Sequence, residues 1–257
     1  MLKQLFDLSG RVAVISGGSR GLGLQIAEAL GEFGARLVLT ARKEAELATA
    51  VARLVDQGVA AMPITADLAD PAAAEIIVER ALSAFGRIDI LVNNAGTAWG
   101  APAEDHPLAA WRKVIDLNLT GAFLLTQAVG RAVMLPKRSG LILNIASIEA
   151  LRGRPRGMPG TIAYAASKGG MISFTRSLAA EWGSFGITVN AIAPGFFDSK
   201  MTHVTLERFG ERIAAATPLG KLGGPHDLKG AALLFASDAG GHITGQVLAI
   251  DGGATLV

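Results

Sequence analysis

The feature that most constrains the fold of this chain is an alternation of short apolar segments with longer helical patterns. The short segments are rich in Val, Ile and Leu and cover residues 11–16, 36–40, 60–65, 88–93, 141–146, 187–193 and 245–250. They lack the apolar–polar alternation of a half-exposed strand, so we expect strands that are buried on both faces. Strands of this kind, separated by helices, require right-handed crossovers and a parallel sheet with helices on both sides.

The boundaries of the helical patterns support this arrangement. Asp70 is expected to cap a helix that has Pro71 at its first position and ends at Gly86. We find no linker, internal repeat or change of composition along the chain. The prediction is an α/β fold of the doubly wound Rossmann type. It forms a single domain over 1–257, with one seven-stranded parallel sheet in the order 3-2-1-4-5-6-7.

Composition and charge exclude several classes of protein. The chain has no cysteine, which excludes disulfides, thiolate metal sites and a cysteine nucleophile, and fits a reducing, cytoplasmic compartment. Its net charge of +2 gives no electrostatic footprint for nucleic acid. Charges at Lys3, Asp7 and Arg11 leave no room for the apolar centre of a signal peptide. The longest uncharged stretch, 183–197, is too short and too interrupted to span a membrane.

A glycine-rich turn follows the first expected strand. In "SGGSRGLG", Gly17, Gly21 and Gly23 have the spacing G-x-x-x-G-x-G, a variant of the dinucleotide fingerprint. Gly17 would form the tight turn and Gly21 would let the backbone approach a pyrophosphate at a helix N-terminus. Gly23 would let that helix lie close to the sheet. The alternative is an ordinary strand-to-helix turn, but the position after a buried strand favours the fingerprint.

The end of the second expected strand indicates the type of dinucleotide. An NAD site usually has an acid there that binds the ribose 2′-hydroxyl. In "LTAR" this position is Ala41, Arg42 follows it, and Arg20 lies in the glycine turn. Two guanidinium groups without a carboxylate suit a 2′-phosphate, so NADP(H) is the predicted cofactor. The alternative is that both arginines are ordinary solvated side chains.

The only tyrosine of the chain lies in "TIAYAASKGG", where Lys168 follows Tyr164 by four positions. Residues with this spacing share one face of a helix, so the phenol and the ammonium can point into the same crevice. A nearby positive charge stabilises phenolate and is expected to lower the pKa of the phenol towards neutrality, although burial opposes this. Tyr164 is therefore a candidate proton donor to a carbonyl oxygen. The alternative is a buried aromatic residue whose hydroxyl satisfies a backbone group.

Several motifs together resemble the short-chain dehydrogenases/reductases along essentially the whole chain. They are "NNAG" (93–96), "LNLTG" (117–121), Ser147, the Tyr164–Lys168 pair and "PG" (194–195), in that order. The resemblance implies an NAD(P)(H)-binding fold, a catalytic set of Asn118, Ser147, Tyr164 and Lys168, and a homotetramer. In this family pattern Ser147 orients the carbonyl oxygen, Lys168 also holds the nicotinamide ribose, and Asn118 holds a water that connects Lys168 to solvent.

The resemblance and the glycine turn together give a set of expected cofactor contacts. They are Gly17, Ser19, Arg20, Gly21, Leu22, Gly23, Arg42, Asp67, Leu68, Asn93, Ala95, Gly96, Tyr164, Lys168, Pro194, Gly195 and Phe197. Asp67 and Leu68 would contact the adenine. One departure from the family pattern lies between Ser147 and Tyr164, which are a few positions further apart than usual. The extra segment, 149–160, contains three arginines and is expected at the mouth of the site.

The predicted function is NADPH-dependent reduction of a ketone to a secondary alcohol, with a 3-oxoacyl thioester as one candidate substrate. The loops also resemble gluconate 5-dehydrogenase-like proteins, so a sugar-acid or polyol dehydrogenase is the first alternative. A non-catalytic NADP(H)-binding sensor is the second, but all four catalytic residues are retained. No metal is expected, because His106, His203, His226 and His242 are far apart in the sequence. Trp99 and His106 either line the substrate entrance or pack within a loop.

Overall fold

The computed structural model describes residues 1–154, 157–158 and 160–257. It contains a seven-stranded parallel sheet in the order β3-β2-β1-β4-β5-β6-β7, which confirms the predicted order. The strands are β1 Val12–Ser16, β2 Arg36–Ala41, β3 Ala61–Thr65, β4 Ile90–Asn93, β5 Gly140–Ile145, β6 Ile187–Pro194 and β7 Val247–Ile250. Each expected strand is present, with ends that differ by at most two residues.

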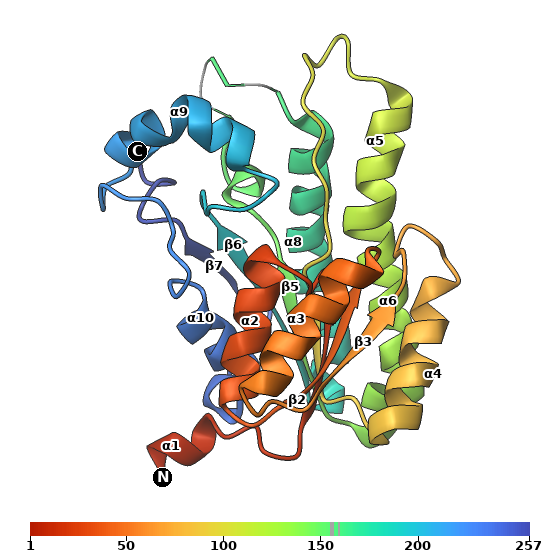
Figure 1. The fold of residues 1–257 in the computed structure, drawn as a ribbon. Helices are drawn as coiled ribbons and strands as arrows, with labels where there is room; N and C mark the ends of the chain where they lie inside the picture. Colours follow the sequence, from red (N-terminus) through yellow and green to blue (C-terminus); the bar gives the residue numbers. More distant parts are fainter. Residues whose placement is uncertain (155–156, 159) are drawn as a thin grey trace.

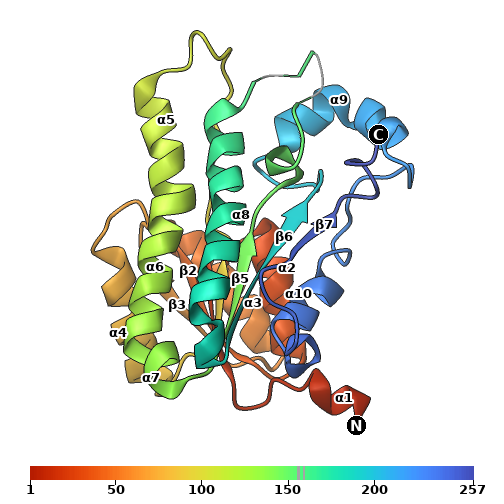
Figure 2. The same ribbon diagram turned by 180° about the vertical axis from the view of Figure 1, so that it is seen from behind.

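Helices cover both faces of the sheet (Figures 1 and 2). The α-helices are α1 Leu2–Leu5, α2 Gly21–Glu32, α3 Glu44–Asp56, α4 Ala73–Phe85, α5 Leu108–Ile115, α6 Gly121–Val129, α7 Leu135–Lys137, α8 Ile162–Trp182, α9 His203–Ala216 and α10 Lys229–Phe235. Short π-helical segments, η1 Asp116–Thr120 and η2 Gly130–Met134, continue α5 and α6. The 3-10 turns are η3 Ile148–Ala150, η4 Gly183–Phe185 and η5 Asp238–Gly240.

The core has two layers because successive strand residues point to opposite faces of the sheet. In β1, Ala13 and Ile15 pack with the buried residues of α2, α3 and α10. Val12 and Val14 of the same strand pack with α4, α6 and α8 on the other side. All five residues of β1 are buried, as the uninterrupted apolar pattern predicts.

The expectation of burial on both faces is wrong for the two edge strands. In β3 only Ile64 is fully buried, and none of the residues of β7 is. Within the described residues each of these strands pairs with one neighbour, so one side of its backbone has no strand partner there. Pro63, which has no N–H to donate, is compatible with such a position. The apolar content of a strand therefore did not distinguish the centre of the sheet from its edges.

The predicted ends of α4 are partly correct. Gly86 ends the helix in the left-handed conformation, with φ 72°. The helix begins at Ala73, later than expected, because Asp70 caps the turn that precedes it. The Asp70 carboxylate accepts a hydrogen bond from the Ala72 N–H at 3.0 Å, and the backbone carbonyl of Asp70 accepts one from the Ala73 N–H.

The continuous helical run Leu108–Lys137, which comprises α5, η1, α6, η2 and α7, is long and apolar enough to cross a membrane by length and composition. Half of its most apolar window is buried inside the protein. Buried core helices of globular proteins pass the same test, so the run is weak support for a membrane span.

A chain of hydrogen bonds between polar side chains crosses one half of the core. The Asn93 amide donates to the Thr126 hydroxyl at 2.8 Å and to Oδ1 of Asn144 at 2.9 Å. The Asn144 amide in turn donates to the Thr175 hydroxyl at 2.9 Å. All four side chains are buried, so these bonds connect β4, α6, β5 and α8 where water cannot replace them.

Thr126→Val should destabilise the protein by about 1–3 kcal/mol. Valine keeps the shape of threonine but leaves the buried Asn93 amide without one of its acceptors. Urea unfolding would measure the loss. Thr49→Val is the matched control, because that hydroxyl is exposed on α3 and should change stability by less than about 0.5 kcal/mol. Equal, small effects of both substitutions would contradict a structural role for the network.

Candidate active site

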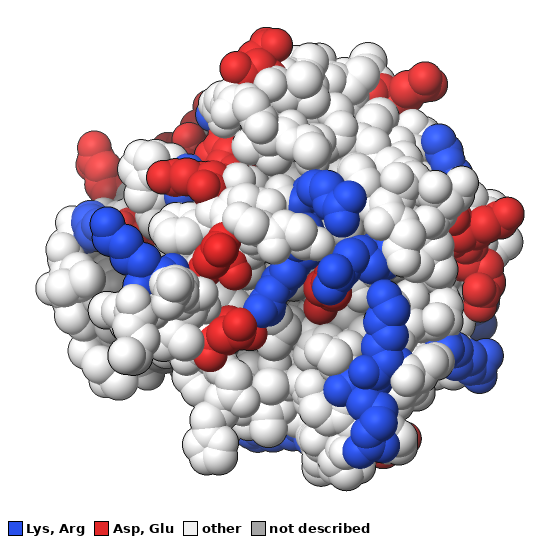
Figure 3. Space-filling view, turned by 90° about the horizontal axis from the view of Figure 1, so that it is seen from below, with Lys and Arg blue, Asp and Glu red and all other residues white. Residues whose placement is uncertain are grey.

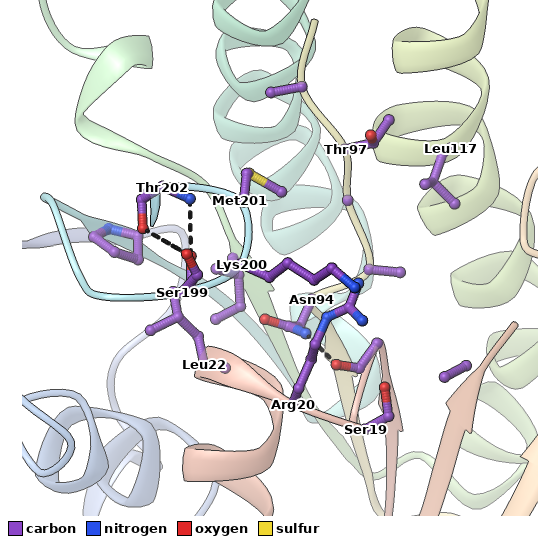
Figure 4. Close-up of a pocket in the computed structure, with 18 of the residues that line it drawn as sticks. Ser19, Arg20, Leu22, Asn94, Thr97, Leu117, Ser199, Lys200, Met201 and Thr202 are labelled. Atoms are coloured by element: carbon purple, nitrogen blue, oxygen red, sulfur yellow. Dashed lines mark hydrogen bonds between the residues drawn. The ribbon is translucent and has the colours of Figure 1, made fainter. Parts of the chain in front are cut away.

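A cavity of about 460 Å³ lies at the carboxyl ends of the strands. One wall comes from the glycine turn after β1, a second from the segment after β4, and a third from the loop after β6 (Figure 4). Ser147 and the first turns of α8 close the cavity at its inner end. In an open parallel sheet this edge is where ligands bind, since the crossovers on the two faces diverge there.

The glycine turn is held against the segment after β4. Gly17 has φ +64°, and a Cβ on this residue would lie 2.9 Å from the Cα of Ala95. The Asn94 amide donates to the carbonyls of Ser16 and Gly17, both at 3.0 Å. A Cβ on Gly23 would lie 2.4 Å from the Gly17 carbonyl oxygen, so α2 can approach the turn only because this residue is glycine. The roles predicted for Gly17 and Gly23 in the turn agree with this geometry.

Three of the four predicted catalytic residues line the same end of the cavity: Ser147, Tyr164 and Lys168. Ser147 follows β5 and accepts a hydrogen bond from the Glu149 N–H at 3.2 Å. Tyr164 and Lys168 project from α8, and the ammonium lies 5.7 Å from the centre of the phenol ring. Nζ of Lys168 donates to the carbonyl oxygen of Ile145 at 2.6 Å, so the end of β5 fixes the lysine in place.

The predicted direction of the tyrosine pKa shift is wrong for this structure. Burial raises the pKa of Tyr164 to about 12, although a hydrogen bond with Ser147 acts in the opposite direction. Burial also lowers the pKa of Lys168 to about 8. The sequence-based prediction rested on the charge of Lys168, which was expected to outweigh desolvation of the phenol. In the folded protein the loss of water around the phenol is the larger effect.

Asn118 lies next to this group but does not line the cavity. It is fully buried within η1, and its amide donates to the Thr97 carbonyl at 2.9 Å and to the Ser167 hydroxyl at 3.0 Å. Its Oδ1 accepts from the Thr97 N–H at 2.8 Å. The side chain thus fastens the segment after β4 to α8. Both of its N–H donors are used, so a water on this side chain could only donate to the remaining lone pair of Oδ1.

The arginines predicted to bind a 2′-phosphate both line the cavity, but each has a carboxylate partner. Arg20 pairs with Glu46, and Nη1 of Arg42 lies 3.7 Å from the carboxylate of Asp67. Neither acid lies at the end of β2, where Ala41 stands, so the absence of a carboxylate that was predicted for that position holds. Glu46 comes from the first turn of α3, and Asp67 follows β3.

Most of the predicted cofactor contacts line the cavity. They are Gly17, Ser19, Arg20, Gly21, Leu22, Arg42, Leu68, Ala95, Gly96, Tyr164, Lys168, Pro194, Gly195 and Phe197. Gly23 and Asp67 do not line it: the first packs under the turn and the second lies at the rim beside Arg42. Asn93 does not line it either, because its side chain belongs to the buried network with Thr126 and Asn144. Its neighbour Asn94 takes the place on the wall.

Part of the cavity lining was not predicted from the sequence. The missed residues are Thr40, Lys43, Glu46, Ala66, Asn94, Thr97, Ala98, Leu117, Ile145, Ala146, Ser199, Lys200, Met201 and Thr202. Most are neighbours in the sequence of predicted residues, and a window of one or two positions around each motif would have included them. Glu46 and Lys200 give no such signal, because they reach the cavity from segments that carry no motif.

Two further features predicted for the mouth of the site can now be placed. Arg154 forms an ion pair with Glu149 at 2.9 Å, and Arg152 donates to the carbonyl of Ala254 near the end of the chain. Arg156, the third arginine of the extra segment, lies outside the described residues. Trp99 and His106 do not line the cavity. His106 packs edge-on against Trp111, which favours the loop-packing alternative for this residue.

Within residues 1–154, 157–158 and 160–257, no group of three or more His, Asp or Glu side chains could hold a metal ion. The prediction that the site uses no metal stays a prediction.

Comparison with known proteins gives the same relationship over the whole chain. A family profile described as enoyl-(acyl carrier protein) reductase matches residues 17–255. The chain is 37% identical to gluconate 5-dehydrogenase of Gluconobacter oxydans, across 98% of this chain and 97% of that protein. It is 38% identical to 3-oxoacyl-[acyl-carrier-protein] reductase of Escherichia coli, across 98% and 100%. A solved structure of a gluconate 5-dehydrogenase from Burkholderia cenocepacia, in complex with NADP and tartrate, superposes with a TM-score of 0.94 at 36% identity and full coverage of both chains.

Replacing the buried lysine should change how stability depends on pH. The pKa of Lys168 is about 8 in the folded chain against its ordinary 10.5, so between these values the unfolded chain binds the extra proton. Wild-type stability therefore gains a contribution that increases with pH across this window. Relative to Lys168→Met, the free energy of unfolding of the wild type should rise by about 3 kcal/mol from pH 8 to pH 10.5.

Urea unfolding of both proteins across that pH range would measure this difference. Any loss of stability from the missing bond to Ile145 is independent of pH and leaves the slope unchanged. Parallel pH profiles would show that Lys168 titrates at its ordinary pKa.

Proposed function

The chain belongs to the short-chain dehydrogenase/reductase family, and we propose that it is an NADP(H)-dependent carbonyl reductase that interconverts a ketone and a secondary alcohol. The observation that carries the proposal is the grouping of Ser147, Tyr164 and Lys168 at one end of a cavity whose other end holds the glycine turn and a set of cations. The first end supplies hydrogen bonds and a proton, and the second suits the phosphates of a dinucleotide.

The residues of the cavity fit a dinucleotide phosphate. Gly17 and Gly21 have positive φ angles, which favour glycine at both positions. Because glycine has no side chain, the backbone at the start of α2 is accessible to a ligand. Helix N-termini attract phosphate groups. Arg20, Arg42 and Lys200 add positive charge to the same end of the cavity. We propose that these groups hold the phosphates, and that Lys168 holds the nicotinamide ribose.

The chemistry proposed for the inner end is reduction of a carbonyl carbon with protonation of its oxygen. NADPH, when bound, supplies the hydride. Tyr164 donates its phenolic proton to the carbonyl oxygen, so the C=O bond becomes a CH–OH group and the tyrosine is left as phenolate. Ser147 hydrogen-bonds the same oxygen and orients it. The Lys168 ammonium stabilises the phenolate and returns a proton to it.

The pKa values of the two residues indicate their protonation states at neutral pH. With a pKa of about 12, Tyr164 is present almost entirely as the phenol, the form that protonates a carbonyl oxygen. Lys168, with a pKa of about 8, is still mostly charged at pH 7. Both residues are therefore in the forms that the proposed proton donation needs before the reaction begins.

The remaining expectations form part of the same proposal. We propose that 1–257 acts as one domain on a small-molecule substrate in the cytoplasm, without a membrane or nucleic acid as partner. The absence of cysteine supports a reducing compartment. On the face seen in Figure 3, lysine and arginine side chains gather in a short band that acidic side chains interrupt, and most of the surface is uncharged. Such a mixed face is unlike the continuous basic surface of a nucleic-acid-binding protein.

We also propose a homotetramer. Leu248 on the edge strand β7 is 39% exposed, and Leu219 and Leu256 are more exposed still. Leu219 and Leu256 border an apolar hollow of about 540 Å³ beside this edge. An edge strand with apolar surroundings is stabilised by a partner that covers it.

Light scattering at micromolar concentration should give about four times the chain mass of 26.5 kDa. A particle of single-chain mass would contradict the tetramer without bearing on the chemistry of the site.

The carbonyl reductase proposal is tested by the loss of NADPH absorbance with a panel of simple ketones, 3-oxoacyl thioesters and 5-ketogluconate. Turnover of the thioesters would favour the first reading of substrate class, and turnover of 5-ketogluconate would favour the sugar-acid alternative. An enoyl thioester is included as a substrate with a C=C bond to be reduced in place of a ketone. Activity with that compound alone, or tight NADPH binding with no turnover of any compound, would contradict the proposal.

Tyr164→Phe should lower turnover of the best substrate by at least about 10²-fold, because it removes only the hydroxyl that donates the proton. The circular dichroism spectrum and NADPH affinity should be unchanged, since the ring and its packing remain. Phe174→Leu, in the middle of the same helix and away from the cavity lining, is a control for disturbance of α8. Normal turnover by Tyr164→Phe would leave the tyrosine as a packing residue and remove it from the mechanism.

A further inference from the structure

A single carboxylate connects three positively charged side chains at the outer end of the cavity. Glu46 pairs with Arg20, and its Oε1 lies 3.1 Å from Nζ of Lys43 and 3.9 Å from Nζ of Lys200. The three cations come from the glycine turn, from the residue before α3, and from the loop after β6. All four side chains line the cavity. We call these four residues the Glu46 cluster.

The geometry of the cluster brings like charges together. Arg20 and Lys200 extend toward one another from opposite sides of the cavity (Figure 4). Two cations in this arrangement repel each other unless an anion lies between or beside them. Glu46 supplies that anion, and the hydrogen bond from Lys43 together with the charges of Arg20, Lys43 and Lys200 keeps the pKa of Glu46 below its ordinary value. The carboxylate is therefore charged at neutral pH.

The loop that carries Lys200 is held in shape by its own hydrogen bonds. The Thr202 hydroxyl donates to the Phe197 carbonyl at 2.6 Å and lies 2.9 Å from the Ser199 hydroxyl. Because these bonds flank Lys200 on both sides, its backbone is fixed at the rim of the cavity. The lysine side chain, 64% exposed, remains free to exchange one anionic partner for another.

We propose that Glu46 is a built-in counter-ion for these cations, and that the 2′-phosphate of NADP(H) must compete with it for Arg20, Lys43 and Lys200. Glu46 would then determine how strongly the site prefers NADPH over NADH. The inference rests on the proposed function, since it concerns binding of that cofactor. The sign follows from charge: a phosphate monoester carries about −1.5 to −2 at pH 7 and is repelled by a carboxylate beside the cations that attract it.

The opposite role for Glu46 makes a different prediction. An acid near the end of the second strand of a dinucleotide fold often accepts hydrogen bonds from the ribose 2′-hydroxyl of NADH. If Glu46 had this role, removing its charge would weaken the binding of NADH. If Glu46 served only to orient Arg20, removing its charge would weaken the binding of NADPH. Only competition between Glu46 and the 2′-phosphate predicts tighter binding of NADPH with almost unchanged binding of NADH.

The test is isothermal titration calorimetry of Glu46→Gln with NADPH, NADH and adenosine 2′,5′-bisphosphate. Glutamine keeps the size of the side chain and removes its charge. NADPH and the bisphosphate should bind about 3- to 10-fold more tightly than to the wild type, the scale of a few exposed ion pairs, whereas NADH should change by less than about twofold. The gain should shrink as salt is added, because exposed charges are screened.

The matched control is Glu44→Gln. Glu44 lies in the same first turn of α3, is exposed, and forms no ion pair within the described parts of the chain. It changes the net charge equally, so a general electrostatic effect would appear in both variants and would overturn a specific role for Glu46. Lys200→Gln should weaken NADPH binding several-fold, both as a single substitution and when it is combined with Glu46→Gln. This result would show that Lys200 binds the cofactor whether or not Glu46 is charged.

Unchanged or weaker NADPH binding by Glu46→Gln would overturn the inference while the reductase proposal stands. Weaker NADH binding would instead assign Glu46 to the ribose. Failure of the wild type to bind either dinucleotide would overturn the proposed function itself, so the two failures are distinguishable.

Discussion

The site depends on the close approach of two backbone segments, the glycine turn after β1 and the Asn94–Ala95 segment after β4. They meet because β1 and β4 are adjacent in the sheet, where the order of strands reverses direction along the chain. Ser16 takes part from β1: its hydroxyl accepts from the N–H groups of Asn94 and Ala95 at 3.0 and 3.1 Å. Any Cβ on Gly17 would separate the two segments. Without this contact the end of the cavity at the glycine turn and the end at Ser147 and Tyr164 would not share a wall.

The buried polar residues near this junction divide into two kinds. The Asn93 amide donates to Asn144, and Asn144 donates to Thr175, so these buried asparagines hold strands and helices together and do not line the cavity. Asn118 joins Thr97 to Ser167 and so keeps the segment after β4 in contact with the helix that carries Tyr164. Neighbouring asparagines in this region therefore differ in role because they differ in what surrounds them, although they are the same residue type.

The architecture could be predicted from the sequence because it depends on local patterns. Apolar runs without alternation identify buried strands, and the spacing of Gly17, Gly21 and Gly23 identifies the turn after the first one. The order of strands was predicted from the doubly wound Rossmann arrangement. The same reasoning placed Tyr164 and Lys168 on one helix face, and both line the cavity.

The electrostatics of the site could not be predicted in this way, because they depend on distances between segments that are remote in the sequence. The direction of the Tyr164 pKa shift reflects how completely the fold removes water from the phenol, which no spacing of residues reveals. Glu46 and Lys200 meet across the cavity although more than half of the chain separates them. Asn93 was predicted to line the cavity, but its neighbour Asn94 does so, because the sequence does not show which of two adjacent asparagines faces the cavity.

The occurrence of a single tyrosine gives the protein an internal spectroscopic probe. Tyr164 is the only residue of its type in the chain, and it lines the cavity beside Ser147 and Lys168. Growth on fluorinated tyrosine would therefore introduce one fluorine resonance, located at Tyr164 and needing no assignment. Its chemical shift would follow ionisation of the phenol and arrival of a ligand in the intact wild-type protein, without any substitution in the site.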